Sequence, residues 1–267
     1  MEAKHLYLPA ALTAPVMYVG SLYILDRDQF HSDHPVTIKK RFIGVAASTT
    51  ITVMSTYILL YQDFKTPHTV MGLYANLDTL EKCLHSFILT SSIYLGTFYM
   101  EILDGTWGFY SAFSPFEWLA CLKDLVWLRN NVIAPITEEL VFRGCAAVLI
   151  QHSLGKPCAL FFSPLLFAIS HYHHLRNDIN HGSTVTQALL TRTFQATYTY
   201  LFGGYATFLT QQYGQILPTI LSHALCNSMG LPRVWDLMDY PKKHRFFIVV
   251  ANMAGLAGFA YGVYRMI

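Results

Sequence analysis

Charge is what this sequence lacks most. Only 13% of its 267 residues are Asp, Glu, Lys or Arg, about half the share usual in globular proteins, whereas 53% are hydrophobic. A soluble domain of this length needs a charged surface, and these residues are too few to form one. The formal net charge is only +2, and no basic run is interleaved with aromatic residues, so we expect no nucleic-acid partner.

Several patterns of chemically active residues are missing as well. The five cysteines form no CxxC pair and no zinc spacing, which argues against a disulfide framework. The HExxH motif of the common zinc-protease helix is absent. No long hydrophilic stretch, internal repeat or low-complexity segment divides the chain. We therefore expect one integral-membrane domain over residues 1–267, with no metal and no other cofactor.

Apolar blocks of membrane length are what the sequence does contain. A helix crosses the hydrocarbon of a bilayer with about 20 apolar residues. The blocks without charge are Leu6–Leu25, Phe42–Gln62, Cys83–Met100, Pro157–Tyr172, Ile216–Met229 and Phe246–Tyr264. Two further apolar stretches carry charged residues, Ile136–Gln151 and Val185–Thr210. These blocks predict an all-α, polytopic membrane protein with about eight transmembrane helices in the lipid bilayer.

Lys and Arg are distributed unevenly among the connections between these blocks. The odd-numbered connections hold most of them, including Lys39, Lys40, Arg41, Lys242, Lys243 and Arg245. Because basic residues favour the cytosolic side, we expect the odd-numbered connections in the cytosol and both termini across the membrane. The third connection is amphipathic from Trp118 to Arg129, which indicates a segment at the membrane interface.

Three of the apolar stretches contain polar residues that a membrane helix does not need. Ionisable residues in such helices are costly and by default indicate a functional site. In residues 131–144, NVIAPITEELVFRG, Pro135 suits a first helical position, and acidic residues beside it could simply complement the helix dipole. Arg143 requires a partner, and Glu139 lies on its face four residues earlier. Glu138, about 100° around the helix, is left to face another group.

The other two stretches supply two histidines and an asparagine. In FAISHYHH, residues 167–174, His171 lies one turn after Phe167, and a histidine at the end of a span can also be an interfacial residue. In LSHALCNSMG, residues 221–230, His223 and Asn227 lie on one helix face. Such a pair can join neighbouring helices or donate two hydrogen bonds to one oxyanion.

The expected topology gives these four residues a common depth. Glu138 begins a span entered from the cytosol, His171 ends a span that leaves to the cytosol, and His223 and Asn227 lie in a span that also exits there. All four therefore fall in the cytosolic half of the bilayer. A carboxylate, an imidazole and two hydrogen-bond donors together indicate water activation and acyl cleavage.

The three motifs together resemble a known family. Glu-Glu-x-x-x-Arg (138–143), Phe-x-x-x-His (167–171) and His-x-x-x-Asn (223–227), in this order, are similar to those of the CAAX protease and bacteriocin-processing superfamily. The segments WLRNNVIAPITEELVFRG, HYHH, FQATYTYLFGGYATFL and LSHALCNSMG resemble the eukaryotic type II CAAX prenyl endopeptidases, the Ras-converting enzymes. YVGSLY and DHPVTIKKRF near the start fit as well, so the resemblance covers most of the chain.

This resemblance implies a fold of eight transmembrane helices around a conical cavity open to the cytosol and the membrane. It implies that Glu138 activates the hydrolytic water with help from His171, and that His223 and Asn227 stabilise the oxyanion. Glu139 and Arg143 would hold the glutamate helix, with Phe167 as a further supporting residue. The implied substrates are prenylated CAAX proteins such as Ras-like GTPases, which lose their last three residues at the endoplasmic reticulum membrane.

Other functions remain open from the sequence. Glu138, His171 and His223 could be zinc ligands from separate helices. A thiol protease fits poorly, because neither Cys145 nor Cys226, the cysteines near the motifs, has an obvious histidine partner. The buried polar groups could instead form the proton relay of a transporter, although no inverted repeat supports this. A non-catalytic scaffold for lipidated tails would share the cavity but would tolerate loss of Glu138.

Overall fold

A computed structural model describes residues 4–25, 32–106, 108 and 114–267. Within these residues every regular element is an α-, 3₁₀- or π-helix and none is a strand, as the sequence predicts. The chain forms two compact units: unit 1 comprises Met1–Asn76 and Ile136–Thr219, and unit 2 comprises Leu77–Pro135 and Ile220–Ile267. The single domain over residues 1–267 stays a prediction.

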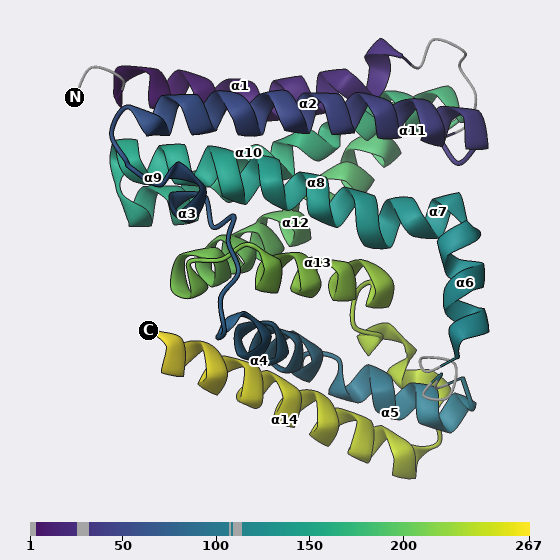
Figure 1. Cartoon of the computed structure of the whole chain (residues 1–267). Helices are drawn as coiled ribbons and strands as arrows, with labels where there is room; N and C mark the ends of the chain where they lie inside the picture. Colours follow the sequence, from purple (N-terminus) through teal and green to yellow (C-terminus); the bar gives the residue numbers. More distant parts are fainter. Residues whose placement is uncertain (1–3, 26–31, 107, 109–113) are drawn as a thin grey trace. The chain divides into compact units, whose positions relative to one another are not determined.

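Two long helices open unit 1. α1 (Lys4–Ile24) and α2 (Pro35–Tyr61) lie side by side (Figure 1). They approach closely because small residues face each other: a Cβ atom on Gly44 would lie only 2.5 Å from the carbonyl oxygen of Ser21. The Ser48 hydroxyl donates a hydrogen bond of 3.1 Å to Ser21 Oγ at the same place. Small and hydroxyl-bearing residues commonly hold membrane helices together in this way.

The remaining helices of unit 1 pack against this pair or against one another. They are the short α3 (Pro67–Val70), the π-helix η3 (Leu140–Ala147), α9 (Val148–Leu154), α10 (Lys156–Ser170), the 3₁₀-helix η4 (His171–His174), α11 (Leu175–Asn180) and α12 (Val185–Tyr213). Gly155 joins α9 to α10 with φ +96°, which favours glycine. A capping box of Thr184 and Gln187 begins α12.

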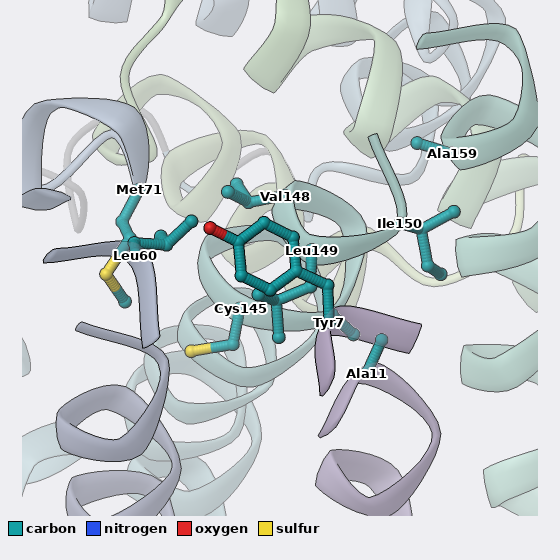
Figure 2. Packing of buried hydrophobic residues seen from close by; sticks show 10 residues of the cluster. Tyr7, Ala11, Leu60, Met71, Cys145, Val148, Leu149, Ile150 and Ala159 are labelled. Atoms are coloured by element: carbon teal, nitrogen blue, oxygen red, sulfur yellow. The ribbon is translucent and has the colours of Figure 1, made fainter. Parts of the chain in front are cut away.

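The apolar core of unit 1 lies among α1, the end of α2, η3 and α9 (Figure 2). Among the described residues, its buried members are Tyr7, Ala11, Leu60, Met71, Cys145, Ala146, Val148, Leu149, Ile150 and Ala159. Tyr7 is completely buried, and its hydroxyl donates a 2.6 Å hydrogen bond to the Asp63 carboxylate just beyond the end of α2. The core therefore ties α1 to the helices that follow the catalytic candidate Glu138.

Unit 2 is built around α4 (Thr79–Ser92), α5 (Leu95–Asp104) and α14 (Lys242–Met266), the last of which runs along the first two (Figure 1). The contact is close, because a Cβ atom on Gly255 would collide with the carbonyl oxygen of Ser92. The other elements of this unit are α6 (Pro115–Lys123), α7 (Leu125–Leu128), the π-helix η2 (Arg129–Ile133), α13 (Leu217–Met229) and the 3₁₀-helix η5 (Val234–Asp239). Unit boundaries fall within α8 (Ala134–Glu139) and α13.

Three helices of the described residues, α1, α2 and α14, are long and apolar enough to cross a membrane, or four if α4 and α5 are one broken span. The sequence predicts about eight spans because hydropathy alone treats every apolar block as one span. α10 and α13 have only 15 and 13 residues, and the Ile136–Gln151 block is divided among α8, η3 and α9. α12 has 29 residues, but it is less apolar than those three helices.

The predicted continuous span Cys83–Met100 is bent by 70° between α4 and α5. Three hydroxyl side chains turn back onto the helix before the bend, from Ser86 to Cys83 O, from Thr90 to Ser86 O and from Ser92 to Leu89 O. Such bonds compete with the regular helical hydrogen bonds and bend helices. The hydropathy pattern does not reveal this competition.

The amphipathic third connection contains two helices, α6 and α7. Ser114 accepts a hydrogen bond from the Glu117 amide at the start of α6, and the extended Asp124 accepts bonds from the first amides of α7. None of the residues of α6 is buried, and Phe116 is 84% exposed. An apolar, unburied helix of this kind is typical of a segment at a membrane interface.

Candidate active site

Glu138 lies near the end of α8, between two π-helices. Helical conformation runs without interruption from Leu125 through η2, α8 and η3 to Leu154. The helix therefore does not begin at Pro135 as the sequence suggests, and Glu138 is not at a helix start where an acidic side chain would simply complement the dipole. π-helical turns are rare and occur frequently at functional sites, because they re-aim side chains.

The predicted pair of Glu139 and Arg143 is present. Arg143 Nη1 donates to Glu139 Oε1 at 2.8 Å, and both side chains are completely buried. An ion pair in an apolar interior requires further contacts to offset its desolvation. The guanidinium carbon of Arg143 lies 4.3 Å from the ring centroid of Phe167 and 5.8 Å from that of Phe202, close enough for cation–π interactions.

Gly203 on α12 makes room for this guanidinium. A Cβ atom at Gly203 would lie 3.0 Å from Pro164 Cβ and 3.2 Å from Arg143 Nη2. Only a residue without a side chain lets α12 approach so near. The stretch containing Gly203 resembles the family in sequence, but the sequence does not indicate which glycine of the Gly203–Gly204 pair is needed.

His171 begins η4, where the chain leaves α10. Its Nδ1 lies 2.8 Å from the Phe167 carbonyl oxygen. Because a carbonyl oxygen only accepts hydrogen bonds, Nδ1 carries the proton, and in the neutral ring Nε2 then carries the lone pair. The ring also packs edge-on against Phe167, with centroids 4.9 Å apart and planes at 90°. Phe167 thus contacts both His171 and Arg143.

His223 and Asn227 lie on α13, in unit 2. His223 is 4% exposed, whereas Asn227 is exposed and donates a 2.8 Å hydrogen bond from Nδ2 to the Asn130 carbonyl oxygen. An asparagine side chain has two N–H groups, so this bond engages one of its two donors. A 2.9 Å hydrogen bond between Thr90 Oγ1 and Ser222 Oγ anchors α13 to α4.

The structure therefore brings the predicted residues together in two groups. In unit 1, Glu139, Arg143, Phe167 and His171 form an unbroken series of contacts, and Glu138 is next to it in the chain. In unit 2, His223 and Asn227 share α13. Sequence reasoning missed Gly203 and also Tyr18, whose hydroxyl is hydrogen-bonded to Glu138. The sequence signal for Tyr18 is a tyrosine within an apolar helix.

A separate polar cluster lies after His171 in the chain and consists of His173 and His174 of η4, Asp178 of α11 and Arg192 of α12. Arg192 Nε donates to Asp178 Oδ2 at 2.6 Å, and this bond holds the pKa of the Asp178 carboxyl below its usual range. Burial, reinforced by the neighbouring His173 and Arg192, lowers the pKa of His174 to about 3. His174 is therefore neutral at physiological pH.

No group of three His, Cys, Asp or Glu side chains within the described ranges could hold a metal ion. Glu138 and His171 belong to unit 1 and His223 to unit 2, so the zinc set that the sequence leaves open would require ligands from both units. That the protein works without a metal stays a prediction.

Known proteins with similar sequences give these residues a context. Residues 122–229 match the family model described as type II CAAX prenyl endopeptidase Rce1-like. The chain is 34% identical over 252 residues to CAAX prenyl protease 2 of Caenorhabditis elegans, covering 94% of this chain and 93% of the relative. It is 32% identical to CAAX prenyl protease 2 of Homo sapiens, covering 95% of this chain and 77% of the relative.

A relative in Saccharomyces cerevisiae with the same name is 40% identical over a shorter stretch of 115 residues. No solved structure matches the chain at comparable stringency. The similarity to the first two relatives extends over nearly the whole chain, and the apolar helices agree with a membrane protease. The chain belongs to the family of type II CAAX prenyl endopeptidases.

Proposed function

We propose that this protein is an intramembrane endopeptidase that removes the last three residues of farnesylated or geranylgeranylated CAAX proteins, Ras-like GTPases among them. The observation that carries the proposal is the match to CAAX prenyl protease 2 over 94% of the chain. The region matched by the family model, residues 122–229, contains Glu138, His171, His223 and Asn227.

In the proposed reaction Glu138 acts as general base and takes a proton from water, with His171 as the second group that orients this water. The resulting hydroxide attacks the carbonyl carbon of the prenyl-cysteine, the C–N bond to the next residue breaks, and its nitrogen leaves with the proton that Glu138 took from the water. The Nδ1–H of His171 is engaged by the Phe167 carbonyl, so in the neutral ring it is Nε2 that carries the acceptor lone pair.

His223 and Asn227 are proposed to donate hydrogen bonds to the oxyanion of the tetrahedral intermediate. Each side chain carries an N–H donor, and the low exposure of His223 favours a strong hydrogen bond, because electrostatic interactions weaken less in an apolar environment. Removal of one such donor typically lowers kcat by a factor of about 10² to 10³.

We assign the enzyme to the endoplasmic reticulum membrane, with its active site in the cytosolic half of the bilayer. The basic connections around Lys39 and Lys242 support this orientation. A prenyl group that partitions into the membrane would hold the scissile bond at one depth, which orients it before the reaction.

The proposal is tested with purified protein in liposomes and a farnesylated CAAX peptide, with products identified by mass spectrometry. One cut after the modified cysteine is expected. Glu138→Gln keeps the size of the side chain but cannot take a proton, so turnover should fall by a factor of about 10² or more. Near-normal turnover by folded Glu138→Gln would contradict the proposed base.

Metal analysis of the same active preparation separates the proposal from its zinc alternative. We expect no stoichiometric metal and full activity after replacement of all five cysteines. One tightly bound zinc per active molecule would favour zinc ligation by Glu138, His171 and His223. Inhibition by a chelator alone decides little, since added zinc can also inhibit by binding the histidines.

A further inference from the structure

Tyr18 is a polar residue that reaches the site from a helix outside the three motifs. It lies in the last third of α1 and is 6% exposed. Tyr18 belongs to the buried face of this helix, because it continues the helical spacing of four other buried residues, Tyr7, Ala11, Ala14 and Ser21. α1 packs with this face against η3 and α9.

The hydroxyl of Tyr18 has two partners on α8. Its oxygen lies 3.0 Å from Thr137 Oγ1 in a buried contact, and it is hydrogen-bonded to the Glu138 side chain. A tyrosine hydroxyl carries one proton, and a carboxylate can only accept. With Glu138 ionised, Tyr18 therefore donates to Glu138, and Thr137 donates to Tyr18.

The ring of Tyr18 is held by aromatic contacts that lead to His171. Phe142, completely buried in η3, lies edge-on to Tyr18 with centroids 6.0 Å apart. Phe142 contacts Phe167 at 4.8 Å, and Phe167 contacts His171 at 4.9 Å. Edge-to-face pairs at these separations are favourable and orient the rings. The groups beside Glu138 and His171 are thus connected through one packed series of rings.

We propose that Tyr18 is a positioning residue for catalysis, which fixes the orientation of the Glu138 carboxylate through the hydrogen-bonded series from Thr137 to Tyr18 to Glu138. This inference rests on the proposed role of Glu138 as general base. Glu138 is only partly buried, and its side chain has several rotatable bonds, so a fixed donor is needed to keep it in one orientation. Tyr18 does not itself act on the substrate.

The test is Tyr18→Phe, which removes one oxygen atom and keeps the ring. A hydrogen bond to a charged group contributes about 1.5–3 kcal/mol, so kcat should fall by a factor of about 10 to 100. The KM for a farnesylated CAAX peptide should change less than about twofold, because the lipid and peptide contacts remain. Thermal stability of the detergent-purified variant is measured in parallel.

Tyr7→Phe is the matched control. Tyr7 is also a buried tyrosine of α1, but its hydroxyl donates to Asp63. We expect this variant to keep the wild-type kcat even if its melting temperature falls. An equal loss of kcat in both variants would show a general packing effect and would overturn the proposal.

Thr137 gives an independent second test. Thr137→Ser keeps the hydroxyl that donates to Tyr18 and should retain most of the turnover, whereas Thr137→Val should lower kcat in the same direction as Tyr18→Phe. Wild-type kcat in Tyr18→Phe, together with an inactive Glu138→Gln, would overturn the role of Tyr18 and leave the proposed function intact. An active Glu138→Gln would instead overturn the proposed function itself.

Discussion

At the residue scale, the buried ion pair of Glu139 and Arg143 is the feature that most strongly restrains the site. Both side chains are inaccessible to solvent, and the guanidinium is enclosed by Phe167, Phe202 and α12. Breaking such a pair leaves a buried charge without its partner. Replacing both members with apolar residues removes that penalty.

The prediction from this pair is a difference between single and double variants. Glu139→Leu should destabilise the protein by about 3–5 kcal/mol, which lowers Tm by roughly 10 °C. The double variant Glu139→Leu/Arg143→Leu should recover most of that loss, because neither charge remains. Thermal unfolding of the detergent-purified variants checks this. A double variant as unstable as Glu139→Leu alone would contradict it.

His174 makes the stability of the protein depend on pH. Its pKa is lowered to about 3 in the folded protein, against about 6.5 in an unfolded chain. Between these values the unfolded state binds one more proton, so stability decreases as the pH falls. The lowered pKa of the Asp178 carboxyl makes stability depend on pH only below about pH 4. Above the pKa that this carboxyl has in the unfolded chain, it is ionised in both states, and its contribution to stability is constant.

We therefore expect Tm to fall when the pH is lowered from 7 to 5, and to fall less in His174→Asn. His173 is buried beside His174 and its pKa is also lowered, so part of the dependence should remain in the single variant. The measurement is Tm at several pH values for both proteins. Parallel pH profiles for the wild type and His174→Asn would contradict this assignment.

At the element scale, α12 positions Arg143 through the absence of a side chain at Gly203. Gly203 and its neighbour Gly204 are both in the same helix, but no atom of the described residues lies within 4 Å of where a Cβ atom on Gly204 would be. Replacement by alanine would therefore bring the same gain in helix propensity at both positions, but only at Gly203 would the added methyl group meet neighbouring atoms.

Gly204→Ala should leave activity unchanged and raise stability by about 0.5–1 kcal/mol. Gly203→Ala should instead lower stability by about 1–3 kcal/mol and reduce turnover, since Arg143 is clamped by Glu139 and Phe167 and cannot move away. Denaturation and peptide-cleavage assays on both variants check the contrast. Equal behaviour of the two variants would show that Arg143 adapts to the added methyl group.

Local spacing was enough to predict some of these features and not others. The pairing of Glu139 with Arg143 follows from a separation of four residues, and the structure confirms it. The π-helices around α8 and the 70° bend after Ser92 were not predictable, because both depend on competition among hydrogen bonds that hydropathy does not report. The contact between Tyr18 and Thr137 joins residues 119 positions apart and requires the tertiary fold.

At the scale of the whole molecule, composition predicts an all-α membrane protein, and the helices confirm this. The orientation in the membrane stays a prediction from the basic connections. Lys39, Lys65 and Lys242 are all exposed, so they are suitable positions for single cysteines in a protein whose five native cysteines have been replaced.

A membrane-impermeant thiol reagent applied from the cytosolic side should label Cys at positions 39 and 242 and leave Cys at position 65 unlabelled. Labelling from the opposite side should give the reverse result. If position 65 alone reacted from the cytosol, the proposed site would face the lumen, where cytosolic lipidated proteins do not reach it.

The most direct test of the central claim compares one CAAX peptide with and without its farnesyl group, using the purified protein in liposomes. The lipid should contribute to turnover as well as to apparent affinity, because remote binding energy orients the scissile bond. We expect one cut, between the modified cysteine and the next residue, and at least about a hundredfold lower kcat/KM for the unprenylated peptide, or roughly 2.7 kcal/mol. Equal cleavage of the two peptides would contradict recognition of the prenyl group.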